Sequence, residues 1–232
     1  MNEFSKAFEA VEVKKPEVEN FKDIKPESDM SVKEAKSFVD GLFEAKPEQS
    51  DGFYSTYEDR VNIISEWIKV KLDSGGYYEG DFAESKFVPS EKTESGRAAK
   101  EKLAEYGMDG IEYKNAEADF SKCSEATVKI DNMTANRLDY YDANGERQQG
   151  NFTQADIKCA EMWNVTEKDG KTDWSARDVK EWRQENKCSW HECCDTKTMQ
   201  LVPQEIHSYF SHTGGVYECK TRDNNSGGGF DE

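Results

Sequence analysis

The spacing of hydrophobic residues predicts three helices in the first half of the chain. Residues 31–34 form a capping box, and apolar residues follow it at helical spacing, so we expect a helix from about residue 31. A second helix should run from about residue 55 until the Gly75–Gly76 pair, and a third over about 95–106. We expect all three apolar stripes, including Trp67 in the second, to face a core.

The second half of the chain shows a mixed pattern. Short strands are predicted at residues 111–113 and 127–130, and helical spacing recurs near 134–141 and 153–163. Residues 175–178 are typical of the start of another short helix. The combination indicates an α+β fold.

A hairpin followed by a helix is predicted between residues 188 and 210. Two β-prone runs flank a polar break at Asp195-Thr-Lys197, in which we expect Asp195 to act as a turn residue. Pro203 suits the first position of the helix, which should end before Gly214–Gly215. We expect Trp190, on the first strand, to pack behind the hairpin.

All three histidines of the protein fall within the 22 residues from His191 to His212. Imidazoles gathered in this way suit a divalent metal or a proton-transfer site. His207 and His212 are five residues apart, which is roughly 140° around an ideal helix. Both can therefore face one metal only if the helix ends between them.

The charge of the protein is unevenly distributed. The net charge is −17, and residues 1–120 carry 28 acidic against 17 basic side chains. Residues 151–200 are nearly balanced, with 10 acidic and 8 basic side chains. The acidic excess argues against phosphate-rich partners for the front half only, and we interpret it as a surface for a protein partner.

The chain contains six cysteines and no run of 18 apolar residues. We therefore expect no membrane span. Residues 1–30 lack the apolar segment of a signal peptide, and the cysteines are expected to be reduced thiols.

The C-terminal motifs resemble the HNH/endonuclease VII superfamily. More narrowly, they resemble the nuclease domains with a Trp-His-His or Trp-His-Glu signature at the C-termini of bacterial polymorphic toxins. The residues that carry the resemblance are Trp190-His191-Glu192, the run from Thr198 to Pro203, Ile206-His207 and His212 to Gly215. Looser similarity upstream extends the resemblance to about residues 50–222.

The resemblance implies a ββα-metal (His-Me finger) nuclease core with a mainly helical N-terminal part. Residues 1–50 would be a partly disordered connector, 51–120 a helical or mixed preface, 121–222 the nuclease core and 223–232 a flexible tail. The resemblance implies that the protein is a metal-dependent endonuclease, and we expect its substrate to be DNA rather than RNA. One divalent ion (Mg, Mn, Zn or Ni) would be the cofactor.

The resemblance leaves two arrangements of the site open. In the first, which the pKa of an ordinary imidazole favours, His191 is the general base and Glu192 orients it or helps to bind the metal. In the second, His191 is a ligand and Glu192 is the base. With His191 as the base, His207 and His212 are the expected metal ligands, although His207 could instead be a core histidine that caps the helix. Arg137 could clamp a phosphate.

Three features also permit other interpretations. Arg137 could instead pair with Asp139 or Asp142. The acidic excess could belong to a non-catalytic protein, a DNA mimic or a binder of a basic partner. The histidines, with Cys188, Cys193, Cys194 or Cys219, could form a structural zinc site in a binding module.

The toxin resemblance also carries expectations about biology. A cognate immunity protein would neutralise the domain in the producing cell. A specialised bacterial system would secrete it, and it would act in the cytoplasm of the target cell during interbacterial competition.

Overall fold

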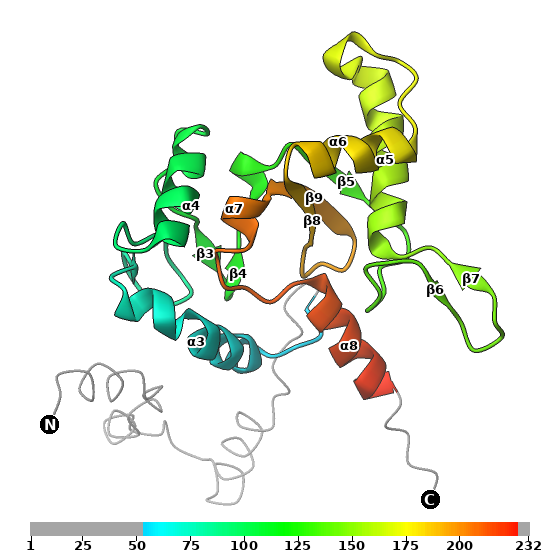
Figure 1. The fold of residues 1–232 in the computed structure, drawn as a ribbon. Helices are drawn as coiled ribbons and strands as arrows, with labels where there is room; N and C mark the ends of the chain where they lie inside the picture. Colours follow the sequence, from blue (N-terminus) through cyan, green and yellow to red (C-terminus); the bar gives the residue numbers. More distant parts are fainter. Residues whose placement is uncertain (1–52, 227–232) are drawn as a thin grey trace, which may run out of the picture. The chain divides into compact units, whose positions relative to one another are not determined.

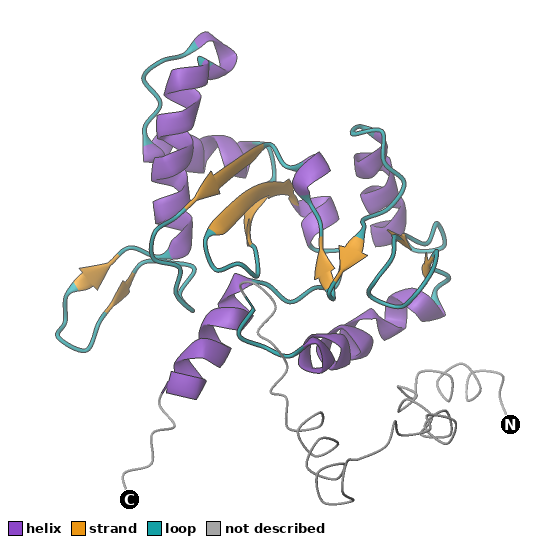
Figure 2. Ribbon diagram, turned by 180° about the vertical axis from the view of Figure 1, so that it is seen from behind, coloured by secondary structure: helices purple, strands orange, loops and turns teal. Residues whose placement is uncertain are grey.

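The computed structural model describes residues 53–226, which lie within one compact unit. Helices are combined there with four small antiparallel sheets, which confirms the α+β prediction (Figures 1 and 2). The helix predicted from residue 31 and the connector over residues 1–50 lie outside the described residues.

The first half contains two of the predicted helices and two small sheets. The elements are α3 (Tyr57–Asp73), β1 (Tyr77–Tyr78), β2 (Phe87–Val88), α4 (Glu94–Ala104), β3 (Tyr113–Lys114) and β4 (Glu117–Ala118). Helix α3 begins two residues later than expected. Its N-cap is Thr56, whose side chain accepts from the backbone N–H of Asp59 while the Asp59 carboxylate caps Thr56 in return.

The second half supplies the main sheet and the helices around it. The strands are β5 (Ala126–Lys129), β6 (Tyr140–Tyr141), β7 (Arg147–Gln148), β8 (Cys188–Glu192) and β9 (Thr198–Pro203). The helices are η2 (Ser121–Cys123), α5 (Asn151–Thr166), η3 (Lys168–Gly170), α6 (Ala176–Glu185), α7 (Gln204–His207) and α8 (Gly215–Ser226). The predicted hairpin and the helices beginning near 153 and 175 are thereby confirmed.

The main sheet has the order β5-β9-β8 and separates two hydrophobic cores. Successive residues of a strand point to opposite faces, so the register Trp190↔Leu201 and His191↔Gln200 assigns alternate residues to alternate cores. One core, here the α5 core, includes Val128, Trp163, Val179, Trp190 and Leu201. The other, here the α4 core, includes Ile64, Leu103, Phe120, Val202 and Phe210.

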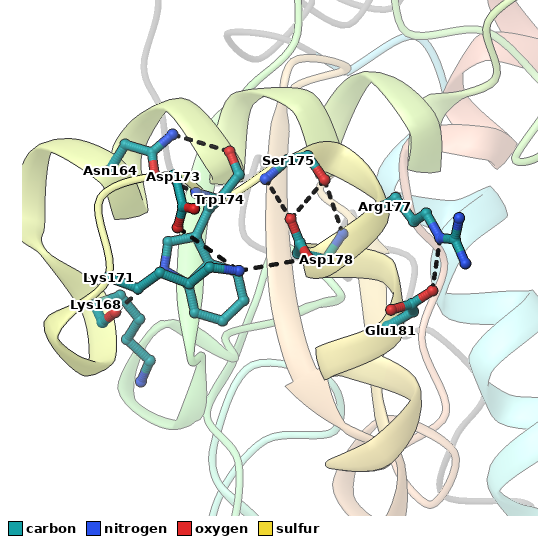
Figure 3. Close-up of polar contacts among 9 residues, drawn as sticks. All are labelled: Asn164, Lys168, Lys171, Asp173, Trp174, Ser175, Arg177, Asp178 and Glu181. Carbon is teal, nitrogen blue, oxygen red and sulfur yellow. Dashed lines mark hydrogen bonds and ion pairs between the residues drawn. The ribbon is translucent and has the colours of Figure 1, made fainter.

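A polar junction fixes α6 against the end of α5 (Figure 3). The Asn164 side chain accepts from the backbone N–H of Trp174 at 2.5 Å and donates to the Trp174 carbonyl at 2.9 Å. The next residue, Ser175, forms the predicted capping box with Asp178. The Trp174 ring packs on Trp163 at 4.8 Å between centroids, so the junction is tied into the α5 core.

The prediction of helix over residues 134–141 is wrong. This stretch is irregular and leads into the β6–β7 hairpin. Asp142 accepts from the backbone N–H groups of Asn144 and Glu146, and Gly145 takes a φ of +77°. Such local side-chain bonds compete with helix formation, and the periodic pattern did not reveal them.

The helix predicted from Pro203 is shorter than expected. Pro203 still belongs to β9 with a ψ of 136°, and α7 is a single turn that ends at His207. The carbonyls of Phe210 and Ser211 accept from the His212 ring and the Tyr113 hydroxyl, at 2.7 and 2.8 Å. Helix-like bonds from Ser208 N–H to the Gln204 carbonyl and from Phe210 N–H to the Ile206 carbonyl continue for a few residues past α7.

The sequence patterns do not predict helix α8. They predict only that the preceding helix ends before Gly214–Gly215 and that a flexible tail begins at residue 223. Helix α8 starts at Gly215 and continues to Ser226. Its Glu218 carboxylate is fully buried and accepts from Ser55 Oγ and from the backbone N–H groups of Tyr54 and Ser55. A contact about 160 residues away in sequence therefore anchors it.

Candidate active site

A cavity of about 390 Å³ opens where the end of β8 meets α3, α7 and α8. All five residues singled out from the sequence line it. These are Arg137, His191, Glu192, His207 and His212. The fold therefore brings together side chains that are up to 75 residues apart.

The three histidines form a tight cluster in this cavity. Their ring centroids are 4.7 Å (His191–His212), 4.9 Å (His207–His212) and 5.4 Å (His191–His207) apart. One ring nitrogen from each lies within 4.8 Å of the other two. Phe120 packs against all three rings, at 4.9 to 5.8 Å between centroids, so the cluster has an apolar backing.

Two of these rings present a nitrogen that is free to bind a cation. His212 Nδ1 lies 2.7 Å from the Phe210 carbonyl; because a carbonyl only accepts, Nδ1 carries the proton and Nε2 keeps its lone pair. His191 is 1% exposed, and its Nε2 has no hydrogen-bond partner among the described residues. A buried polar atom without a partner is costly, and a metal would satisfy it.

Burial keeps the histidine rings neutral. It lowers the pKa of His207 to about 3 and that of His212 to about 4. Burial, with the neighbouring rings adding to it, lowers the pKa of His191 well below its usual range. Neutral imidazole is the form that binds metals.

Glu192 approaches the same cavity from the opposite face of the sheet. It is 3% exposed, and its Oε1 lies 3.5 Å from Asn151 Nδ2 and 3.4 Å from Arg137 Nε. Burial raises the pKa of Glu192, and the charge of Arg137 partly offsets the rise. Glu192 is the last residue of β8, and this position allows it to line one cavity with His191 although adjacent strand residues point apart.

Arg137 does not make the alternative ion pairs considered from the sequence. Asp139 pairs with Arg147 at 2.8 Å, and Asp142 accepts from Gln148 at 2.8 Å. The Arg137 side chain is 59% exposed and faces Glu192. Its guanidinium therefore remains available to a ligand in the cavity.

Gly214 and Gly215 are required by close packing against β8. A Cβ at Gly214 would lie 2.6 Å from the Glu192 carbonyl oxygen, and one at Gly215 would lie 2.7 Å from the carbonyl oxygen of Cys193, which directly follows β8. Both distances are too short for a side chain. The glycines thus let the chain that carries His212 run directly beside Glu192.

The sequence patterns missed the outer wall of the cavity. Trp67 and Ile63 of α3 and Tyr217 and Lys220 of α8 complete it. Trp67 was expected in a core, but its side chain is 56% exposed. The apolar stripe of α3 does not by itself distinguish a side chain that lines the cavity, such as Trp67, from one that is buried in the core.

The roles expected for Trp190 and Asp195 are confirmed. Trp190 is fully buried in the α5 core, and its Nε1 donates to Asp156 at 2.7 Å. Asp195 Oδ1 accepts from the backbone N–H groups of Lys197 and Thr198 at 3.0 and 2.7 Å, which closes the turn.

The six cysteines are free thiols, as predicted. Four of them are buried separately in the two cores: Cys123, Cys159, Cys188 and Cys219. Among residues 53–226, only Cys193 joins a group of side chains that could hold a metal.

The comparison with protein families finds a match in the middle of the chain. Residues 110–214 match the family model of the DNase/tRNase domain of colicin-like bacteriocin. This colicin-type segment includes Arg137 and the whole run from His191 to His212. No curated protein matches the chain in sequence.

The match supports a nuclease domain of a bacterial toxin. It implies a hydrolase that acts on nucleic acid. The matched segment ends at Gly214, so α3 and α8, which form the outer wall of the cavity, lie beyond the colicin-type region. Within residues 53–226, no helix has the length and apolar character needed to cross a membrane.

Proposed function

We propose that this protein is a metal-dependent endonuclease of the HNH type, with β8, β9 and α7 as its ββα-metal core. The observation that carries the proposal is the cluster of three neutral histidines, one buried and two half-buried, beside a buried glutamate in one cavity. The colicin-type match over the same residues supports it.

Of the two arrangements left open by the sequence, the geometry favours the second. His191, His207 and His212 would hold one divalent ion, because their nitrogens converge and His191 Nε2 lacks any other partner. The identity of the ion, Mg, Mn, Zn or Ni, is not fixed by the donor set. When bound, the ion would polarise the scissile phosphate and stabilise the leaving 3′-oxygen.

Glu192 would act as the general base. Its raised pKa increases the basicity of the carboxylate. Asn151 holds it in place, since Asn151 is itself fixed by bonds to both the N–H and the carbonyl of Thr134, at 3.0 and 2.8 Å. The carboxylate would take the proton from the attacking water.

Arg137 and Lys220 would bind the phosphates of the substrate. Both line the cavity, Arg137 from the segment before β6 and Lys220 from α8. Their charges oppose the acidic excess locally, so a net charge of −17 does not preclude binding of nucleic acid. DNA is the proposed substrate.

The biological role follows from the colicin-like match. We propose that the domain is the toxic part of a secreted interbacterial toxin, acting in the cytoplasm of the target cell. A cognate immunity protein would protect the producing cell, and a basic face on that partner would complement the acidic surface.

A metal-titrated cleavage assay tests the proposal. Supercoiled plasmid, single-stranded DNA and RNA are incubated with wild type and with His191→Ala at increasing Mg²⁺, Mn²⁺, Ni²⁺ or Zn²⁺. We expect nicking of duplex DNA that EDTA and His191→Ala both abolish. Cleavage that persists with EDTA or in the folded variant would overturn the metal-dependent mechanism. Preferential cleavage of RNA would overturn the assignment of DNA.

A further inference from the structure

A second group of potential ligands also includes His191. A carboxylate oxygen of Glu117, a ring nitrogen of His191 and Cys193 Sγ all lie within 4.8 Å of one another. Cys193 follows His191 by two residues, so its side chain leaves the chain on the same face. The group is distinct from the histidine cluster, because it contains a thiol and a carboxylate and lacks His207 and His212.

The backbone holds this group in place. Cys193 N–H donates to the Thr198 carbonyl at 2.9 Å, which continues the β8–β9 ladder past Glu192. Glu117, in β4, accepts from the backbone N–H of Cys194 at 2.8 Å. The carboxylate and the thiol are therefore positioned by main-chain contacts and not by each other.

Solvent and ions can reach the group through a second cavity. This cavity has a volume of about 340 Å³, and Glu117 and Cys193 line it together with Asp119 and Asp195. Three carboxylates around one thiol create a local field that attracts a cation. His191 adds a buried imidazole with an unpartnered nitrogen.

We propose that Glu117, His191 and Cys193 form a second metal site, selective for zinc-like divalent ions, which competes with the histidine cluster for His191. Thiolate, imidazole and carboxylate are the ligands that zinc accepts in tetrahedral sites, and water from the cavity would take the fourth position. Hard ions such as Mg²⁺ disfavour a sulfur ligand. On binding, the thiol proton is released to solvent as the metal–sulfur bond forms.

The shared histidine links the site to activity. Both groups include His191, whose unpartnered nitrogen is Nε2, so an ion that binds Nε2 in the thiol site deprives the histidine cluster of its third ligand. Excess zinc would then inhibit a reaction supported by another metal. Only this consequence rests on the proposed nuclease function; the existence of the site does not.

Cobalt spectroscopy tests the site without reference to cleavage. Reduced protein is titrated with Co²⁺, and a thiolate-to-cobalt charge-transfer band is followed in the near ultraviolet. We expect the band in wild type and its loss in Cys193→Ser. Cys188→Ser is the matched control, because it removes a buried thiol from β8, the strand that leads to Cys193, but outside the group. His207→Ala must keep the band, since it disables only the histidine cluster.

Glu117→Gln separates ligation from folding, because the amide oxygen can still accept from Cys194 while the charge is lost. We expect weaker Co²⁺ binding with an unchanged far-ultraviolet circular dichroism spectrum. Absence of the band in wild type, or its persistence in Cys193→Ser, would overturn the site.

Zinc inhibition tests the competition. At fixed Mn²⁺, the zinc concentration that halves cleavage should rise by about 10- to 100-fold in Cys193→Ser relative to Cys188→Ser. Equal sensitivity of the two variants would overturn the sharing of His191. Failure of wild type to cleave any substrate would instead count against the proposed function, and the cobalt result would stand by itself.

Discussion

The two faces of the β5-β9-β8 sheet bring different chemistry to one cavity. On the α4-core side, His191 joins the other two histidines against the apolar ring of Phe120. On the α5-core side, Glu192 lies among polar partners, Asn151 and Arg137. The apolar side favours neutral metal ligands and the polar side favours a charged base, so one strand end serves both tasks.

This division predicts that metal binding and catalytic rate can be separated by mutation. Changes on the α5-core side should slow the reaction and leave the metal bound. Changes on the α4-core side should alter metal binding and the response of the fold to pH.

Glu192→Gln should reduce the cleavage rate by about 10²- to 10⁴-fold, because the amide cannot accept a proton from water. Gln keeps the size of the side chain and can still accept from Asn151. Metal affinity, measured by isothermal titration calorimetry, should change little. Loss of metal binding with this substitution would place Glu192 among the ligands and contradict the division.

Arg137→Ala should lower the rate by about 10²-fold, as expected when a preorganised donor to the phosphate is removed. The pH–rate profile gives a sharper test. Arg137 lowers the pKa of Glu192, so its removal should move the acidic limb of the profile to higher pH. Arg137→Lys, which retains the charge, should leave the limb nearly in place. An unmoved limb in Arg137→Ala would show that Glu192 is not the titrating base.

The metal-free protein should lose stability as the pH falls from about 6.5. The histidines are neutral when folded, with pKa values of about 3 for His207 and about 4 for His212, whereas the unfolded chain takes up protons near 6.5. The free energy of unfolding is therefore retained above pH 6.5 and falls below it. Each buried histidine contributes about 1.4 kcal/mol per pH unit in this window.

Urea unfolding in EDTA at several pH values measures this loss. His207→Asn should show a slope that is shallower by about 1.4 kcal/mol per pH unit between pH 6 and 4, because it removes one titrating ring. Identical slopes for wild type and variant would mean that His207 is protonated in the folded state, which contradicts a neutral ligand cluster.

Lys220→Ala should have the smallest effect, a weaker binding of substrate with little change in rate. Loss of one phosphate contact lowers the slope of log affinity against log salt by about 1. Fluorescence anisotropy with a labelled duplex in EDTA measures it. Lys180→Ala, which removes an exposed lysine from α6, is the control and should leave the slope unchanged. Equal slopes for the two variants would remove α8 from the substrate surface.

Local patterns in the sequence were sufficient for the hairpin and for most helices. The β8–β9 hairpin follows from two β-prone runs around Asp195, and α6 follows from the capping box at Ser175. Both depend on contacts within a few residues, so they can be read directly from the sequence. The clustering of all three histidines within 22 residues likewise marked the region of the site in advance.

Tertiary structure decided how these side chains meet. The chain after α7 allows His207 and His212 to face one point, and the Tyr113 hydroxyl, 98 residues away in sequence, holds that segment by donating to the Ser211 carbonyl. Asn151, which positions Glu192, precedes it by 41 residues, and Lys220 lies on a helix anchored through Ser55. Such long-range contacts leave no periodic trace in the sequence, because each depends on the packing of elements and not on neighbours along the chain.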